Sequence, residues 1–193
     1  MATLVRRWII TSAAVGTRDR KTMKFAYADP PYYKQGVKRY GDKHKNADIW
    51  DDKQAHYELI EILMKDFADG WVLSCNPQDL HWLLPAAPTT RVCVWAKTFH
   101  QIRQTTTQYA FETVLLYGGR VNNKRKPMVR DWISGVPTRK KGLVGAKPEY
   151  FNLWVLDLLN FSVGDELVDL FPGTNGMSNA IEKRRQQWIY EKK

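Results

Sequence analysis

The sequence alternates two kinds of segment, and this alternation limits the folds that the chain can adopt. Short apolar runs typical of buried strands cover residues 25–28, 71–75, 91–95, 112–117, 166–171 and 188–190. Helices are expected over residues 51–67 and 149–160, where apolar side chains recur every three or four positions, and over the segments 77–84 and 178–187. Strands that alternate with helices in this way predict an α/β fold on a mostly parallel sheet.

Length and charge narrow the class of protein further. At 193 residues the chain suits a single domain, and its net charge of +10 favours a polyanionic partner, nucleic acid foremost. The sequence shows no transmembrane-length apolar stretch, no basic amphipathic helix and no signal peptide, so a cytoplasmic protein is expected. Cys75 and Cys93 lie in strand-like runs, which predicts buried thiols, and the scattered histidines lack metal-ligand spacing.

The tetrapeptide Asp29-Pro30-Pro31-Tyr32 follows the first strand-like run. Two successive prolines fix two φ angles and remove two backbone donors, and the first of them keeps Asp29 extended. The expected result is a rigid turn that presents a carboxylate, free carbonyls and a flat ring at the edge of a sheet. Such a turn suits a planar heterocycle with an exocyclic amine. The simpler interpretation is a proline-rich strand exit with a surface tyrosine.

A second constellation, residues 169–176, predicts a strand end, a glycine-containing loop and the start of a helix. In α/β folds nucleotide-like ligands bind at such a place, beyond the carboxyl ends of the strands. The acid Asp169 would repel phosphate and would suit a ligand with an amine, such as S-adenosylmethionine. Glu191, at the end of the run 188–190, would then bond the ribose hydroxyls. Its simpler interpretation is a charged residue in a C-terminal tail.

Residues 118–147 predict a long basic loop, which would hold the phosphates of a nucleic acid. Trp132 and Ile133 in its middle indicate that part of the loop packs against the domain. A solvated flexible linker is the alternative interpretation. The basic residues expected to bind nucleic acid are Arg120, Lys124, Arg125, Lys126, Arg130, Arg139, Lys140 and Lys141.

These motifs together resemble the class I S-adenosylmethionine-dependent DNA amino-methyltransferases. The tetrapeptide at Asp29 matches their catalytic D-P-P-Y type motif, Lys147-Pro148 resembles their K-P element, and residues 169–176 resemble their D-P-F-x-G-S-G-T loop. The catalytic motif precedes the cofactor loop, as in the beta group of these enzymes and in the related messenger-RNA adenosine methyltransferases. Residues 94–97 and 111–116 also resemble the middle section of that related family.

The resemblance implies a Rossmann-like fold with helices on both faces of the sheet, and methylation of adenine N6 in DNA after the base is flipped out. It implies catalytic roles for Asp29, Pro30, Pro31 and Tyr32. It implies S-adenosylmethionine contacts from Asp169, Phe171, Gly173, Thr174, Asn175, Gly176, Glu191 and Lys147. An RNA adenosine methyltransferase and a decayed, nucleic-acid-binding relative stay open, the latter because Pro172 and Asn175 depart from the loop motif. A small enzyme of this kind is typical of bacteria or phages, and a partner could supply its specificity.

Overall fold

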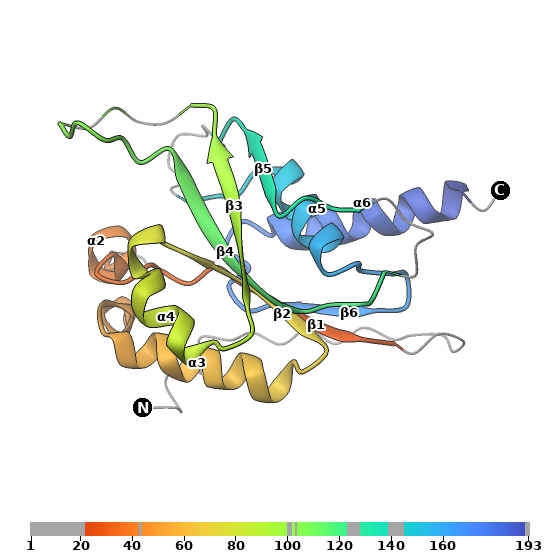
Figure 1. Ribbon diagram of the computed structural model, residues 1–193, viewed down its shortest axis with the longest axis horizontal. Coiled ribbons are helices and arrows are strands. Elements are labelled where there is room, and N and C mark those ends of the chain that lie inside the picture. The colour runs from red at the N-terminus through yellow and green to blue at the C-terminus, as the bar shows by residue number, and fades with distance from the viewer. Residues whose placement is uncertain are drawn as a thin grey trace.

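The computed structural model describes residues 22–42, 44–99, 102, 104–122, 128–138 and 145–191. Within them, strands form a six-stranded sheet in the order β5-β3-β4-β2-β1-β6 (Figure 1). The strands are β1 (Lys24–Ala28), β2 (Gly70–Cys75), β3 (Arg91–Lys97), β4 (Phe111–Gly118), β5 (Trp132–Gly135) and β6 (Glu166–Asp169). Because β4 alone runs antiparallel to its neighbours, the sheet is mostly parallel, as the sequence predicted.

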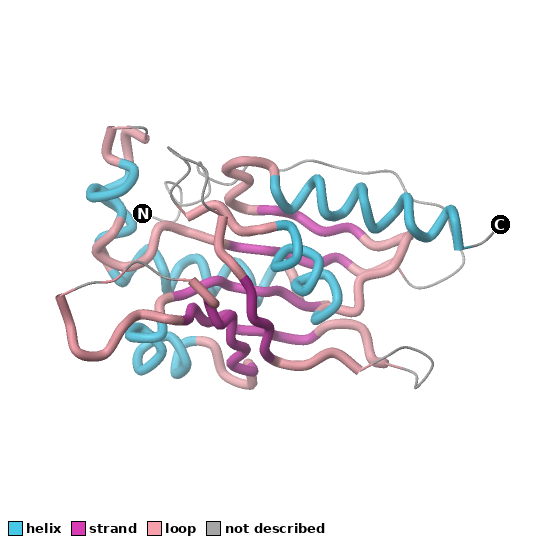
Figure 2. Tube along the Cα trace, turned by 90° about the horizontal axis from the view of Figure 1, so that it is seen from above, coloured by secondary structure: helices cyan, strands magenta, loops and turns pink. Residues whose placement is uncertain are grey.

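Helices cover both faces of this sheet (Figures 1 and 2). One face packs against α3 (Lys53–Asp66) and α4 (Leu80–Ala86), which follows the short 3-10 helix η2 (Pro77–Asp79). The other face packs against α5 (Glu149–Leu158) and α6 (Gly176–Glu191). Side chains of a strand alternate between faces, so in β1 Ala26 packs toward α3 while Tyr27 packs toward α5. The helices predicted over 51–67, 77–84 and 149–160 are confirmed with small shifts of their ends.

Two segments outside the expected helices and strands contain regular structure. Residues 33–48 hold α2 (Gly36–Tyr40) and the start of the 3-10 helix η1 (Ala47–Asp51). The Asp51 carboxylate accepts hydrogen bonds from the amides of Gly36 and Val37, at 2.7 and 3.2 Å, and so satisfies the first turn of α2. The stretch 118–147 is likewise not all loop, because its residues Trp132–Gly135 form the edge strand β5 beside β3.

The predicted strand over 188–190 is wrong, because these residues continue α6 to Glu191. The less exposed side chains of this helix, among them Ala180, Ile181, Arg184 and Trp188, follow a helical period. The Trp188 ring stacks on Phe161 with centroids 6.1 Å apart, which holds the last turns of α6 against the core.

The parallel strands all end at one side of the sheet, here called the carboxyl edge, and begin at the opposite amino edge. Asp29, Lys97 and Asp169 lie at the carboxyl edge, at or just after the ends of β1, β3 and β6. Cys75 and Cys93 are buried, and burial raises the pKa of their thiols to about 12 and about 11. In the described ranges, no helix is long and apolar enough to cross a membrane, and no group of His, Cys, Asp or Glu has the arrangement of a metal site.

Candidate active site

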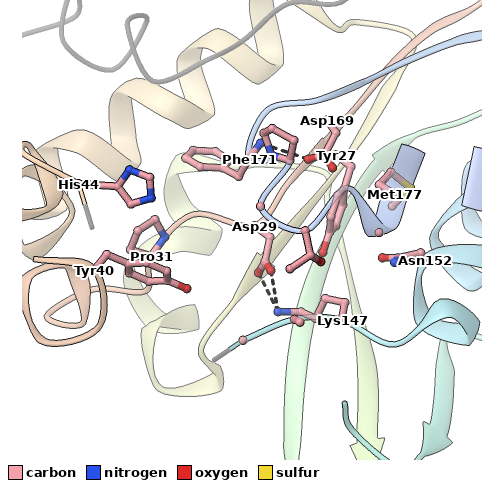
Figure 3. A pocket seen from close by; sticks show the side chains of 16 residues that line it. Tyr27, Asp29, Pro31, Tyr40, His44, Lys147, Asn152, Asp169, Phe171 and Met177 are labelled. Atoms are coloured by element: carbon pink, nitrogen blue, oxygen red, sulfur yellow. Dashed lines mark hydrogen bonds and ion pairs between the residues drawn. The ribbon is translucent and has the colours of Figure 1, made fainter. Parts of the chain in front are cut away.

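The Asp29 carboxylate faces a lysine from a distant part of the chain. The Lys147 ammonium lies 2.8 Å from each of the two carboxylate oxygens, a contact drawn in Figure 3. Asp29 reaches this position because it directly follows β1, whereas Lys147 directly precedes the residue that caps α5. Both side chains are largely buried, with 20% of the Asp29 side chain and 8% of the Lys147 side chain exposed. The pair is therefore a strong, weakly screened interaction.

Glu112 of β4 extends this pair into a network of charges. Its Oε2 atom accepts a hydrogen bond of 2.7 Å from the Tyr32 hydroxyl and lies 3.3 Å from the Lys147 ammonium. Its other carboxylate oxygen is ion-paired with Lys97 of β3. Lys147 also lies over the Tyr32 ring, 5.5 Å from its centroid. The Tyr32 ring is thus fixed by contacts at both its hydroxyl and its face.

The network sets the protonation states of its members. Burial raises the pKa of Asp29, and the Lys147 ammonium opposes this only in part. Burial also favours neutral Glu112, but the ammonium groups of Lys147 and Lys97 outweigh it and lower the pKa of Glu112 to about 2. Burial likewise disfavours the Lys147 ammonium, yet Asp29 and Glu112 hold its pKa well above the usual value. Glu112 and Lys147 are therefore charged at neutral pH, and Asp29 is the carboxyl group of the network that protonates most readily.

A first cavity of about 390 Å³ opens beside Asp29, between the carboxyl ends of β1 and β6 (Figure 3). This volume lies within the range of small-molecule sites in proteins. Tyr27, Asp169 and Phe171 line it, and the amide of Phe171 donates a 3.1 Å hydrogen bond to Asp169. Burial raises the pKa of Asp169 to about 6. The cavity therefore has a mainly apolar wall with an acidic group that ionises just below neutral pH.

The loop between β6 and α6 closes this cavity with backbone and small side chains. Gly173 and Asn175 take positive φ angles of 46° and 58°, and Gly173, Thr174 and Gly176 line the cavity. A Cβ atom on Gly176 would lie 2.8 Å from the Nδ2 atom of the buried Asn152, so this position accepts only glycine without movement of its neighbours. The loop thus brings its backbone close to whatever fills the cavity.

A second cavity of about 360 Å³ lies on the other side of Asp29. Pro30, Tyr32 and Glu112 line it, together with residues of α2, η2 and the segment before β4. Asp29 and Lys147 line both cavities, so the carboxylate stands at the wall that they share. Within the tetrapeptide, Pro31 instead faces the first cavity.

The structure brings together most of the residues that the sequence motifs identified, but not Glu191. Asp29, Lys147, Asp169 and the loop 171–176 meet around the first cavity, although Asn175 turns the chain and does not line the cavity. The prediction for Glu191 rested on a strand that is instead helix. Glu191 is fifteen residues beyond Gly176 in α6, and at 1.5 Å per residue this places it about 22 Å along the helix axis.

The basic residues expected to bind nucleic acid do not gather at the site. The Arg120 guanidinium is ion-paired with Asp165, beyond the end of β4 at the amino edge. Arg130 precedes β5, beside the first half of β3, and its guanidinium lies over the Trp132 ring. Both are therefore remote from the carboxyl edge, and their role in binding nucleic acid stays a prediction. The others, Lys124, Arg125, Lys126, Arg139, Lys140 and Lys141, lie outside the described residues.

Sequence reasoning missed Glu112, Lys97 and Asn152. Glu112 and Lys97 stand in otherwise apolar strand-like runs, and a charged residue in such a run is the signal that could have identified them. Asn152 is a polar residue on the apolar face of α5, buried to 2% exposure. No local pattern shows that these side chains converge, because their partners come from distant segments.

The fold and the site together define a class. The sheet, its flanking helices and the cavities at the carboxyl edge are the architecture of an α/β fold of the methyltransferase type. No protein-family model matches the sequence, and no curated protein does.

Several solved structures share this architecture. The complex of M1.HpyAVI with SAM superposes with a TM-score of 0.55 at 14% identity, covering 84% of this chain and 78% of that one. The structure of M1.HpyAVI by itself superposes with a TM-score of 0.52 at 13% identity, covering 85% of this chain and 78% of that one. TTHA0409 of Thermus thermophilus, described as a candidate DNA modification methylase, gives 0.53 at 13% identity, with 82% and 75% covered. At these identities the similarity shows a common fold.

Proposed function

We propose that this protein transfers a methyl group from S-adenosylmethionine to the exocyclic amine of a nucleobase, with adenine N6 in DNA as the foremost target. The position of Asp29 carries the proposal, because this carboxylate stands between a cavity suited to the cofactor and a polar cavity suited to a base. An acceptor at that wall can hold an amine in one cavity while the amine faces a methyl donor in the other.

The first cavity fits S-adenosylmethionine in both shape and charge. Its apolar wall suits the adenine and the carbon chain, and the Asp169 carboxylate suits an amino group or hydroxyls. Because Gly176 leaves room where a side chain would meet Asn152, the loop backbone can approach the cofactor closely. Bound there, the cofactor supplies an electrophilic methyl group. M1.HpyAVI, which has the same fold, is known in complex with SAM.

In the second cavity the protein would hold and orient the target base. Asp29 and the Pro30 carbonyl accept hydrogen bonds from the amine, which keeps the nitrogen lone pair directed toward the first cavity. The Tyr32 ring, fixed by Glu112 and Lys147, stacks on the face of the base. As the new N–C bond forms, the nitrogen loses a proton, and Asp29 is placed to receive it. Such positioning can lower a barrier by roughly 7–11 kcal/mol.

The target must leave the base stack to enter this cavity, so the enzyme would flip a base out of a duplex or act on a single strand. DNA is proposed as the substrate because one of the similar solved structures, TTHA0409, is described as a candidate DNA modification methylase, and because the net charge of +10 favours a polyanion. Adenine is favoured because an aspartate leads the tetrapeptide, as in most adenine enzymes that this motif resembles.

The test combines cofactor binding with methyl transfer. We expect calorimetry to show one S-adenosylmethionine site, and labelled methyl transfer to DNA followed by nucleoside analysis to give N6-methyladenine. Asp29→Ala and the more conservative Asp29→Asn should each lower the transfer rate at least about 100-fold, since both remove the charged acceptor. Asp131→Asn, an exposed carboxylate near the amino edge, is the matched control and should keep full activity.

The same assay separates the alternatives. Methyl transfer to adenosine in RNA, with none to DNA, would replace the proposed substrate while leaving the site assignment intact. A folded protein that binds nucleic acid but not S-adenosylmethionine would be a decayed relative, and the enzyme proposal would be wrong. Full activity of both Asp29 variants would disprove the role of Asp29 whatever the substrate.

A further inference from the structure

Two half-exposed aromatic rings stand at the rim of the second cavity. Tyr109 precedes β4 and Phe111 begins it, with 47% and 46% of their surfaces exposed, and both line the cavity. The two rings thus place accessible apolar surface directly beside a polar cavity. Tyr109 lies outside every sequence motif, and Phe111 was noted only as the first residue of the segment 111–116, with no role assigned to its ring.

The Tyr109 ring is held in place by a contact with another element. The side-chain amide of Gln78, in η2, donates a 3.1 Å hydrogen bond to the Tyr109 hydroxyl. Phe111 is anchored through its backbone, since it pairs with Ala96 of β3 in the sheet. Because both anchors leave the rings accessible, the rings form a preorganised surface rather than a flexible one.

A cation stands on another part of the same rim. Arg39 of α2 lines the second cavity, is exposed, and makes no ion pair with another residue in the described ranges. The other cations of this cavity, Lys97 and Lys147, are already paired with Glu112 and Asp29. The rim therefore presents flat apolar rings and one available positive charge.

We propose that Tyr109 and Phe111 form a stacking platform for the base next to the target in the same nucleic-acid strand, and that Arg39 contacts a phosphate of that strand. This inference rests on the proposed function. An unpaired strand offers both features that the rim recognises, a flat base for the rings and a phosphate for the guanidinium. The target base enters the cavity, while its neighbour remains outside on the rings.

The experiment uses mixed-sequence single-stranded 12-mer DNA with one central adenine, and matched 12-mers that carry an abasic site directly 5′ or 3′ of that adenine. Dissociation constants are measured with the full chain in the presence of S-adenosylmethionine. The unmodified strand should bind about 5- to 150-fold more tightly than one of the two abasic strands, which is the range for one base stacked on an aromatic ring.

The variants assign this effect to the rim. Tyr109→Ala combined with Phe111→Ala should weaken binding of the unmodified strand by a similar factor and abolish its advantage over the abasic strand. The single variant Phe111→Tyr keeps an aromatic ring at both positions and should therefore keep that advantage. Tyr190→Ala removes an exposed ring at the far end of α6, so this control should bind both strands as the original protein does. Arg39→Gln should lower the salt slope of binding by about one.

The outcomes separate this inference from the proposed function. DNA binding and methyl transfer that are indifferent to both abasic positions would overturn the stacking platform and leave the function standing. If the double variant with Tyr109→Ala and Phe111→Ala still bound the unmodified strand more tightly than the abasic strand, the stacking platform would also be overturned. Absence of both cofactor binding and methyl transfer would overturn the function itself.

Discussion

At the scale of single residues, the Lys147 ammonium is the group on which the charge state of Asp29 depends. Burial alone would keep the Asp29 carboxyl protonated further up the pH scale, and the contacts of 2.8 Å with Lys147 oppose this. An ionised carboxylate only accepts hydrogen bonds, whereas a protonated carboxyl group also carries an O–H donor, so the ionised form of Asp29 is the better acceptor for an amine. Lys147 therefore supports the proposed chemistry through Asp29, in addition to lining the first cavity.

We predict that Lys147→Met moves the acid limb of the pH–rate profile to higher pH. The pKa of Asp29 is already raised by burial, and loss of the ammonium raises it further. Activity is present above that pKa and lost as pH falls through it, so the variant should lose activity at neutral pH and regain part of it at alkaline pH. Methyl transfer measured as kcat/KM between pH 5 and pH 10 tests this.

Two further variants control the Lys147 result. Lys97→Met removes the other cation beside Glu112 but leaves Asp29 paired, so its acid limb should stay near that of the original protein. Denaturant unfolding should show a loss on the order of 3 kcal/mol for Lys147→Met, because a largely buried carboxylate loses its partner. Adding Asp29→Asn should recover part of that loss. An unchanged acid limb in Lys147→Met would show that Asp29 does not depend on the lysine.

A second residue-scale prediction concerns Asp169. Burial raises the pKa of this carboxyl to about 6, and a cofactor with a positively charged amine would bind its ionised form. The affinity for S-adenosylmethionine should therefore be constant above about pH 7 and fall about tenfold per pH unit well below pH 6. Asp169→Asn should bind more weakly and lose this dependence, whereas Glu182→Gln on the exposed side of α6 should keep it. Calorimetry at several pH values measures both, and a pH-independent affinity in the original protein would contradict the assignment.

At the scale of elements, α6 shows what the sequence pattern left undecided. The run Trp188-Ile189-Tyr190 resembles a short strand, but 61% of Ile189 and 76% of Tyr190 are exposed while Trp188 stacks on Phe161. A strand would place Trp188 and Tyr190 on the same face. In the helix they are 200° apart by its geometry of about 100° per residue, so only one of them faces the core.

This geometry predicts unequal effects of two truncations in α6. Trp188→Ala removes a ring from the core cluster and should lower the free energy of unfolding by about 1–3 kcal/mol. Tyr190→Ala removes an exposed ring and should change it by less than about 0.5 kcal/mol. Denaturant titration followed by circular dichroism gives both values. Equal losses would mean that the two rings share one face and that residues 188–190 are not helical.

The elements that could be predicted are those whose signal is local. The runs of β1 to β4 and the apolar spacing of α3 and α5 are visible without any partner. The short strand β5 could not be predicted, because Trp132–Gly135 is defined by its pairing with β3 and lies in a basic stretch. The helix α2 could not be predicted either, since its first turn depends on a hydrogen bond to Asp51, fifteen residues beyond Gly36.

The candidate site divides in the same way. The tetrapeptide at Asp29 and the loop after Asp169 are each a continuous segment, so the chemistry of each could be inferred from consecutive residues. The contacts of Glu112 with Tyr32 and Lys147 join residues 80 and 35 positions apart, and no local pattern contains them. The same limit applies to the basic stretch, because charge in the sequence does not say on which edge of the sheet a residue lies.

At the scale of the whole molecule, the two edges of the sheet have different electrostatic roles. The carboxyl edge holds both cavities and the rim with Arg39, whereas the described basic residues Arg120 and Arg130 lie toward the amino edge. Arg120 is engaged with the buried Asp165, which also accepts hydrogen bonds from the amides of Met23 and Ser162 at 3.0 and 2.7 Å. Arg120 thus ties the segment after β4 to the segment before β6.

This division predicts which arginine a bound strand contacts. Arg130→Gln should leave both the affinity for single-stranded DNA and its salt dependence unchanged, because its side chain lies over Trp132 away from the cavities. Arg39→Gln should weaken binding and lower the slope of log K against log salt by about one, the loss of a single phosphate contact. Binding titrations from about 50 to 200 mM salt compare the two, with thermal unfolding to show that both variants are folded. If Arg130→Gln lowered the slope as much as Arg39→Gln, the strand would extend across the amino edge, and the proposed orientation of the substrate at the carboxyl edge would be wrong.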